Sequence, residues 1–106
     1  MSKANLETAG EGRYRVSGVL DATTVPQLLK ESEEHFARGS NASICIDLSG
    51  VTESDSSGLA LLLEWLRIAR QRGCTVDFEN VPRQIVALAR ISEVEKLIVA
   101  DDQPRA

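Results

Sequence analysis

The chain has 106 residues, a formal net charge of −4 at pH 7, 42% hydrophobic residues and 26% charged residues. This length predicts one domain over residues 1–106, with a core from about residue 6 to residue 99, because it is enough to bury a single hydrophobic core. The acidic balance argues against nucleic-acid binding, which needs a basic face. The aliphatic content argues against disorder except at the ends, and we expect the acidic, proline-containing C-terminal end to be frayed.

Cysteine usage and apolar runs limit the cofactors and the location of the chain. Cys45 and Cys74 belong to no CxxC pair, and the single histidine cannot complete a zinc site, so we expect no metal and no cofactor. We expect both cysteines to be buried free thiols in a reducing compartment. The longest apolar run, Leu59–Leu63, is far too short to span a bilayer, and residues 1–12 contain no apolar signal core. These features predict a cytoplasmic chain without direct membrane insertion.

The first half of the chain predicts two strands and a helix. A short extended segment is expected at residues 6–8, and residues 13–17 alternate polar and apolar side chains, as a half-buried strand does. A turn then ends at Asp21. A threonine at 23–24 is expected to cap a helix that ends near Gly39, where glycine can adopt the left-handed conformation. The predicted inner face of this helix is formed by Val25, Leu28, Leu29, Ser32 and Phe36.

The second half continues the alternation. Ala42–Leu48 predicts a central strand buried on both faces, because it is β-branched and almost continuously apolar. A long helix follows at about Ser57–Arg72, then a strand at Cys74–Glu79. A third helix is expected from about residue 80 to residue 90, with Ile85, Leu88 and Ala89 on its inner face. Leu97–Val99 is interpreted as a last short strand. This order predicts an α/β protein with helices packed on a mixed sheet, in which loops at the carboxyl ends of strands present the functional residues.

The long helix carries more apolar surface than one contact with a sheet requires. Its predicted core stripe is formed by Leu59, Leu62, Leu63, Leu66 and Ala69. Leu61, Trp65 and Ile68 widen that stripe. Either a neighbouring helix, for which the third helix is the expected candidate, covers the surplus, or Trp65 with Leu61 or Ile68 forms an exposed anchor for a partner.

Two adjacent serines, Ser56 and Ser57, precede this helix. Capping of the helix explains one of them. A phosphate on the other would meet the positive end of the helix dipole and would add negative charge beside Asp55 and Glu53. A serine nucleophile would need a general base, yet the only histidine, His35, lies on the first helix, and GxSxG, GxxxxGK[ST] and GxGxxG are absent. We therefore expect a protein that is not an enzyme.

Three stretches carry a resemblance to a known family: Gly18–Asp21, Ile46–Val51 and Asp55–Leu59. Together they resemble the STAS domain family over about residues 6–99. This family includes bacterial anti-sigma-factor antagonists and the MlaB-type subunits of phospholipid-trafficking ABC transporters. The resemblance implies a STAS-like fold, a small mixed sheet of about four to five strands with about three to four helices packed on one side.

The resemblance also implies roles for the site residues. Ser56 would carry the hydroxyl that is phosphorylated or that contacts a partner. The residues around it, Asp55, Ser57 and Gly58, would shape the loop and the start of the helix. Asp21 would close the turn that follows Gly18. The leucine-rich segment 58–73 is more similar to the MlaB-type subunits than to the antagonists.

Two functions are expected from this resemblance. The first is an adaptor that binds the ATPase subunit (MlaF-like) of an Mla-type transporter at the inner membrane and so helps to maintain outer-membrane lipid asymmetry. Its contact surface would be the Ser56 loop and the following helix, with Leu61 and Trp65. The alternative is an anti-sigma-factor antagonist that binds an anti-sigma factor and is phosphorylated on Ser56 by a serine kinase.

Overall fold

The computed structural model describes residues 3–38 and 42–99. The elements in chain order are β1 (Ala4–Gly10), β2 (Arg13–Leu20), α1 (Val25–Arg38), β3 (Ser43–Ser54), α2 (Ser56–Arg72), β4 (Thr75–Glu79), α3 (Arg83–Ile91) and α4 (Glu95–Ile98). The expected alternation of strands and helices is confirmed, and α2 ends at Arg72 as expected. Gly73 follows it in a left-handed conformation, with φ 74°. The expected cap at Gly39 and the expected fraying at the C-terminal end lie outside the described residues.

The prediction of a last strand at Leu97–Val99 is wrong. Leu97 and Ile98 belong to the short helix α4, and the N–H of Val99 donates to the carbonyl of Glu95 at 2.9 Å. A run of three apolar residues fits a turn of helix as well as a strand, because it is too short to show a periodicity. The helical turn buries Ile98 and leaves Leu97 exposed.

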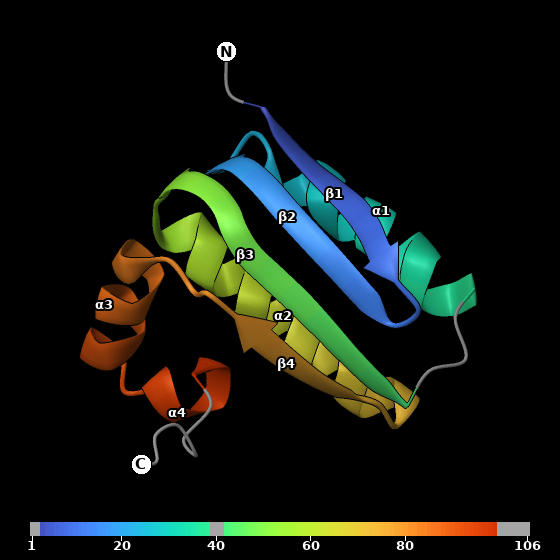
Figure 1. Cartoon of the computed structure of the whole chain (residues 1–106). Helices are drawn as coiled ribbons and strands as arrows, with labels where there is room; N and C mark the ends of the chain where they lie inside the picture. Colours follow the sequence, from blue (N-terminus) through green and yellow to red (C-terminus); the bar gives the residue numbers. More distant parts are fainter. Residues whose placement is uncertain (1–2, 39–41, 100–106) are drawn as a thin grey trace.

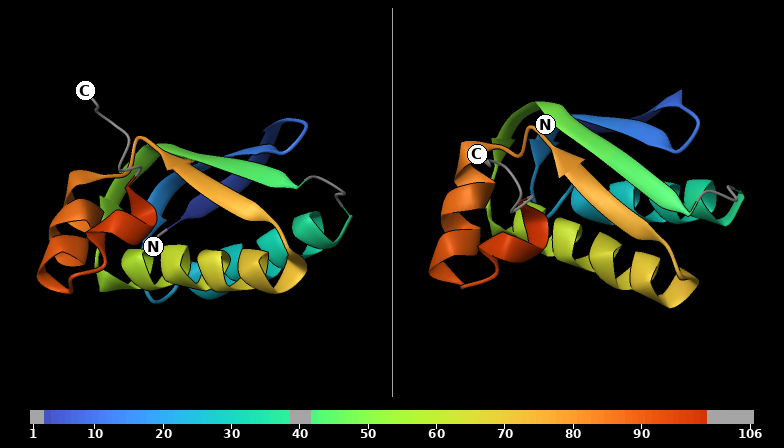
Figure 2. Two further views of the ribbon diagram at one scale, coloured as in Figure 1. Left: turned by 90° about the horizontal axis from the view of Figure 1, so that it is seen from below. Right: turned by 60° about the horizontal axis from the view of Figure 1, so that its bottom comes forward.

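The four strands form one mixed sheet in the order β1-β2-β3-β4. β1 and β2 are antiparallel, whereas β2, β3 and β4 run parallel. Because β2, β3 and β4 follow one another across the sheet in the same direction, crossovers of the same hand place α1 and α2 on the same face. Figure 2 shows both helices beneath the sheet, with α3 and α4 beside one end of it.

One face of the sheet is therefore left without a helix among the described residues. The prediction that β3 is buried on both faces is wrong: Ile44, Ile46 and Leu48 are buried under the helices, but Cys45 and Asp47 on the other face are only half-buried. The expectation of buried thiols also fails, since Cys45 and Cys74 are both partly exposed. An apolar run identifies a central strand, but it does not show whether a second layer covers it.

β3 is also longer than expected, and it bends. It continues past Leu48 to Ser54, and its pairing with β2 shifts register at two places, between Arg15 and Ser17 and between Gly18 and Val19. Such shifts bend a strand, and Figure 1 shows β3 curving towards the start of α2. Gly50 lies at the bend, where a Cβ atom would be 2.8 Å from the Cβ of Ser17. After this bend the chain reaches Ser54, next to the start of α2.

The apolar surplus of α2 is covered inside the molecule. Trp65 is 0% exposed and Leu61 is 1% exposed, so the prediction that they form an exposed anchor is wrong. The indole Nε1–H of Trp65 donates to Ser32 Oγ of α1 at 2.6 Å, and its ring lies 6.4 Å from that of Phe78 of β4. The first helix, α1, therefore helps to cover the additional apolar surface of α2, whereas the sequence favoured the third helix as its cover.

The buried stripe of α2 is rotated relative to the expected one. Leu61, Trp65 and Ile68 are buried, whereas Leu63 and Leu66 are only half-buried. The helical periodicity of the sequence identifies an apolar arc, but which part of a wide arc faces the sheet depends on the tertiary packing. On α3, Ile85 and Ala89 point into the core as predicted, whereas Leu88 is only half-buried.

Candidate functional site

The stretch around Ser56 lies where two parallel strands end side by side. Leu20 at the end of β2 is the register partner of Ser54 at the end of β3, and the N–H of Asp55 donates to the carbonyl of Leu20 at 3.2 Å. Asp21 and the segment Asp55–Gly58 therefore lie at the same end of the sheet. The carboxyl ends of parallel strands are where open sheets of this kind most often bind ligands.

Asp55 is the N-cap of α2. Its Oδ1 accepts a hydrogen bond from the N–H of Ser57 at 2.8 Å, and its backbone is extended, as expected for a cap. The prediction that one of the serines caps the helix is wrong, because aspartate is an equally good cap and precedes them. Both serines lie in the first helical turn, where Ser56 is exposed and Ser57 is half-buried.

Gly58 allows α2 to approach β3 and α3 closely. A Cβ atom on Gly58 would lie 2.0 Å from Ser54 Oγ and 3.1 Å from the Cδ1 of Ile85 on α3. The Ser54 hydroxyl donates to the carbonyl of Asp55 at 3.0 Å. Sequence reasoning named Gly58 but missed Ser54 and Ile85. The inward position of Ile85 was expected. Its proximity to the segment Asp55–Gly58, called the serine loop below, depends on the tertiary fold.

Asp21 organises the neighbouring turn. Its Oδ1 accepts hydrogen bonds from the N–H of Thr23 at 2.9 Å and from the N–H of Thr24 at 3.1 Å. The Thr24 hydroxyl donates to the carbonyl of Val19 at 2.7 Å. The aspartate thus stabilises the passage from β2 into α1, and the threonines expected as caps are among its partners.

The segment Asp55–Gly58 places an exposed hydroxyl at the start of a long helix. Ser56 lies at the positive end of the helix dipole, which favours negative charge, although Asp55 already accepts from the N–H groups of Ser57 and Gly58. The only histidine, His35, is on α1, with its ring 5.6 Å from that of Tyr14 of β2. We therefore assign no general base to Ser56.

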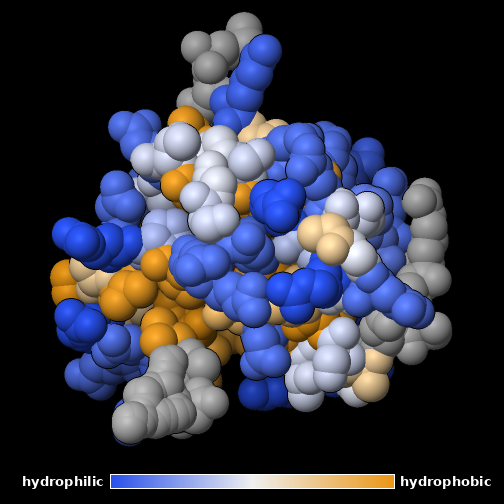
Figure 3. All heavy atoms as spheres, in the orientation of Figure 1, coloured by the Kyte–Doolittle hydropathy of each residue, from blue (hydrophilic) through white to orange (hydrophobic). Residues whose placement is uncertain are grey.

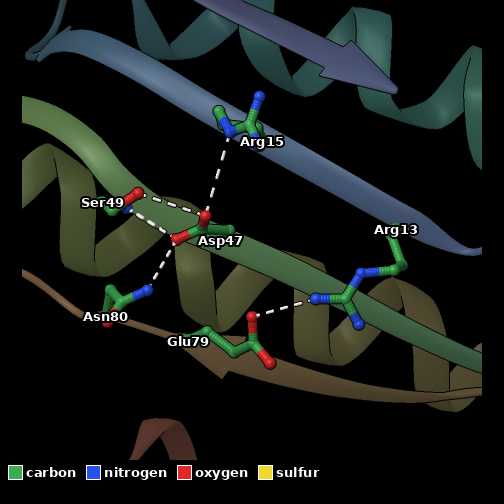
Figure 4. Close-up of polar contacts among 6 residues, drawn as sticks. All are labelled: Arg13, Arg15, Asp47, Ser49, Glu79 and Asn80. Carbon is green, nitrogen blue, oxygen red and sulfur yellow. Dashed lines mark hydrogen bonds and ion pairs between the residues drawn. The ribbon is translucent and has the colours of Figure 1, made fainter. Parts of the chain in front are cut away.

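A second polar cluster lies on the open face of the sheet and was missed from the sequence. Figure 4 shows it; the residues are Arg13, Arg15, Asp47, Ser49, Glu79 and Asn80. Arg13 forms an ion pair with Glu79 at 3.2 Å, so this pair joins β2 to β4 across β3. The two arginines on the same face of β2, Arg13 and Arg15, were the indication available in the sequence. Which carboxylates they pair with depends on the register of the parallel strands.

Hydrogen bonds favour the deprotonated, negatively charged form of Asp47 in this cluster. The side-chain amide of Asn80 donates to it at 2.9 Å, and the N–H of Ser49 also donates at 2.9 Å. These bonds, the amide of Asn80 first, lower the pKa of Asp47, and the nearby Arg15 lowers it further. Burial, followed by Glu79, raises the pKa of Cys45, which disfavours its reactive thiolate form. The cluster is an arrangement of charges that joins strands, without an activated nucleophile.

Within residues 3–38 and 42–99, no group of three histidine, cysteine, aspartate or glutamate side chains is placed to hold a metal ion. None of the helices described there has the length and apolar character needed to cross a membrane.

A family model described as "Mlab, STAS domain" matches residues 5–100. This chain belongs to the MlaB-type STAS domain family. This STAS chain is 36% identical over 76 residues to the intermembrane phospholipid transport system binding protein MlaB of Escherichia coli K12. That match covers 72% of this chain and 74% of the relative. The MlaB of Shigella flexneri matches with the same identity and coverage.

The fold of this STAS chain is similar to that of a solved anti-sigma-factor antagonist. The structure of unphosphorylated SpoIIAA superposes with a TM-score of 0.71 and covers 95% of both chains. The sequence identity is 18%, so this likeness shows the fold alone. It confirms the expected STAS-like α/β architecture.

Proposed function

We propose that this chain is the STAS subunit of an Mla-type phospholipid ABC transporter, where it binds the ATPase subunit and supports its assembly or activity. The observation that carries the proposal is the 36% identity with MlaB, whose name describes a binding protein of an intermembrane phospholipid transport system. In this role the chain is cytoplasmic, associates with the inner membrane through its partner and catalyses no reaction. It contributes to the lipid asymmetry of the outer membrane.

The contact surface in this proposal is the end of the sheet around Ser56, together with Asp21, Asp55 and Ser57. Ser56 and Asp55 are exposed, and the cap on α2 fixes the position of the loop. Gly58 is buried beneath the loop and serves to place it. Leu61 and Trp65 are excluded from this surface by their burial and act only through the packing of α2.

A quantitative binding assay with the purified MlaF-like ATPase subunit of the same organism tests the proposal. Ser56→Glu adds a charge next to Asp55 and is expected to weaken binding at least about tenfold, as loss of a central interface contact does. Thr8→Glu adds the same charge at an exposed position of β1 and is expected to leave binding unchanged. Lack of binding by the wild-type chain would refute the ATPase partner, and equal binding by both variants would refute the Ser56 surface.

The second candidate is an anti-sigma-factor antagonist regulated by phosphorylation of Ser56. It is favoured by the exposure of Ser56 in the first turn of α2, where a phosphate would meet the positive end of the helix dipole. Intact-mass measurement after incubation with the cognate serine kinase and ATP would show one added phosphate. The same addition to a Ser56→Ala variant would place the phosphate elsewhere and exclude this switch.

A further inference from the structure

A groove of about 520 Å³ lies between the second half of α2, the beginning of β4 and α4. Leu63, Leu66, Val76 and Leu97 form its apolar lining, and Arg67 and Arg70 also border it. We call this the α2–β4 groove. Arg70 lies fourteen residues beyond Ser56 on the same helix, which is about 20 Å along the axis. The groove is therefore separate from the serine loop.

The groove adjoins a free edge of the sheet. β4 is the last strand in the order β1-β2-β3-β4, so among the described residues only β3 pairs with it. The N–H of Thr75 donates towards β3, to the carbonyl of Ala42 at 2.9 Å. Successive residues of a strand direct their backbone groups to opposite sides, so the N–H and C=O groups of Val76 and Phe78 point to the free edge. Such an edge can accept another strand.

The side chains at this edge favour an occupant with both apolar and acidic residues. Leu97 is 56% exposed at the groove, and a strand added to β4 would place every second side chain over its apolar lining. Arg67 is paired with Glu64, whereas no carboxylate of the described residues lies within ion-pair distance of the exposed Arg70. A carboxylate on the added segment would pair with Arg70.

The same charges disfavour a second copy of this chain as the occupant. If two β4 strands paired antiparallel around a twofold axis with Val76 opposite Phe78, Asp77 would face Asp77 of the other copy. Like charges directly opposite one another destabilise a strand pair. The arginines of the two grooves would also approach one another. A partner of different sequence fits this surface better.

We propose that the α2–β4 groove binds an extended segment of a partner protein, which pairs with the free edge of β4 and directs apolar side chains and at least one carboxylate towards α2. The inference rests on the proposed function for the identity of the partner, the ATPase subunit. It adds a second contact to that of the serine loop, made by backbone pairing rather than by the hydroxyl of Ser56.

Binding of the ATPase subunit to four variants tests this proposal. Leu97→Asp and Arg70→Glu alter the groove, and each is expected to weaken binding about tenfold. Ile91→Asp changes another exposed apolar side chain, 80% exposed on α3, and Lys30→Glu reverses an exposed charge on α1; both are expected to bind as the wild type does. Circular dichroism of each variant checks that it is folded.

Hydrogen exchange supplies the measurement specific to strand pairing. The amides of Val76 and Phe78 should exchange fast in the chain alone and slowly in the complex. Slow exchange in the chain alone would mean that its own residues already cover the edge, and fast exchange in the complex would exclude strand pairing; either result overturns the proposal.

Three further outcomes separate this inference from the proposed function. Loss of binding in Ser56→Glu with unchanged binding in Leu97→Asp and Arg70→Glu would overturn the groove contact alone. If the wild-type chain does not bind the ATPase subunit, both the proposed function and the partner named here fail. If Arg70→Glu weakens binding to phosphatidylglycerol vesicles but not to the ATPase subunit, the groove binds lipid and the proposal is wrong.

Discussion

Asp47 shows how single residues on the open face of the sheet are held in one ionisation state. Its carboxylate accepts hydrogen bonds from Asn80 and Ser49, and these lower its pKa below the ordinary value of 3.8. The deprotonated form is thus favoured by folding, so its stabilising contribution is present above the ordinary pKa and is lost as the pH falls through the lowered pKa. Asn80 is placed for this bond by a left-handed backbone, with φ 56°.

We predict that Asn80→Gly raises the pKa of Asp47 towards its ordinary value, because it removes the hydrogen bond that lowers this pKa most while glycine keeps the left-handed backbone. The variant should be less stable by about 1 kcal/mol at pH 7, and the difference should shrink below about pH 4. Titration of the Asp47 carboxyl carbon by NMR and urea unfolding at both pH values measure this.

An Asp47→Asn background provides the control for this titration. In it, the effect of Asn80→Gly on stability should no longer depend on pH between 3 and 7, because the titrating group is gone. An unchanged pKa of Asp47 in the Asn80→Gly variant would contradict the assignment of the hydrogen bond.

At the scale of the elements, a buried hydrogen bond connects α1 and α2 within an otherwise apolar layer. Ser32 and Trp65 are both 0% exposed, and the indole N–H donates to the serine hydroxyl. The hydroxyl in turn donates to the carbonyl of Leu29 at 2.7 Å. A serine on the inner face of a helix thus matches the one polar atom of the largest side chain in the core.

We predict that Ser32→Ala destabilises the fold by about 1–3 kcal/mol, because it leaves the buried indole N–H without an acceptor. Urea unfolding followed by the fluorescence of Trp65, the only tryptophan, measures the change. Ser43→Ala, at an exposed serine, should change stability by less than about 0.5 kcal/mol. An effect of Ser32→Ala as small as that of the control would mean that the indole finds another acceptor.

The sequence was sufficient to predict most elements but not how they face one another. Periodicity defined α2, and Leu59, Leu62 and Ala69 of its predicted core stripe are buried. The centre of the wide apolar arc was misplaced, because Trp65 proved to be buried. The local motif identified the loop at Asp55–Gly58, although the cap was assigned to a serine instead of Asp55. The pairs on the open face, such as Arg13 with Glu79, were missed because they depend on strand register.

At the scale of the whole fold, the four helices found among residues 3–38 and 42–99 help to enclose one core, and α4 completes it. Figure 3 shows apolar residues gathered around α3 and in the angle between α3 and the sheet. Ile98 of α4 is 2% exposed within this core, whereas its neighbour Leu97 is largely exposed. Two adjacent residues of one short helix therefore have different roles: Ile98 contributes to the core, and Leu97 contributes to the molecular surface.

We predict that Ile98→Ala destabilises the chain by about 2–4 kcal/mol, since it leaves a cavity in the core. Leu97→Ala should cost less than about 1 kcal/mol, because its side chain is already in contact with water. Unfolding followed by Trp65 fluorescence and by circular dichroism should shift together in Ile98→Ala if α4 belongs to the same cooperative unit. Separate transitions would show that the C-terminal helices unfold independently.

The position of the N-cap of α2 has a consequence for how this surface can change over evolution. Asp55 holds the start of the helix through its own carboxylate, so the side chains of Ser56 and Ser57 are not needed to form it. Exchange of serine for threonine, or of a hydroxyl for a phosphate, can therefore alter what the loop displays at little expense to folding stability. Descendants of one ancestral domain could diverge in their interaction specificity while inheriting an unchanged framework.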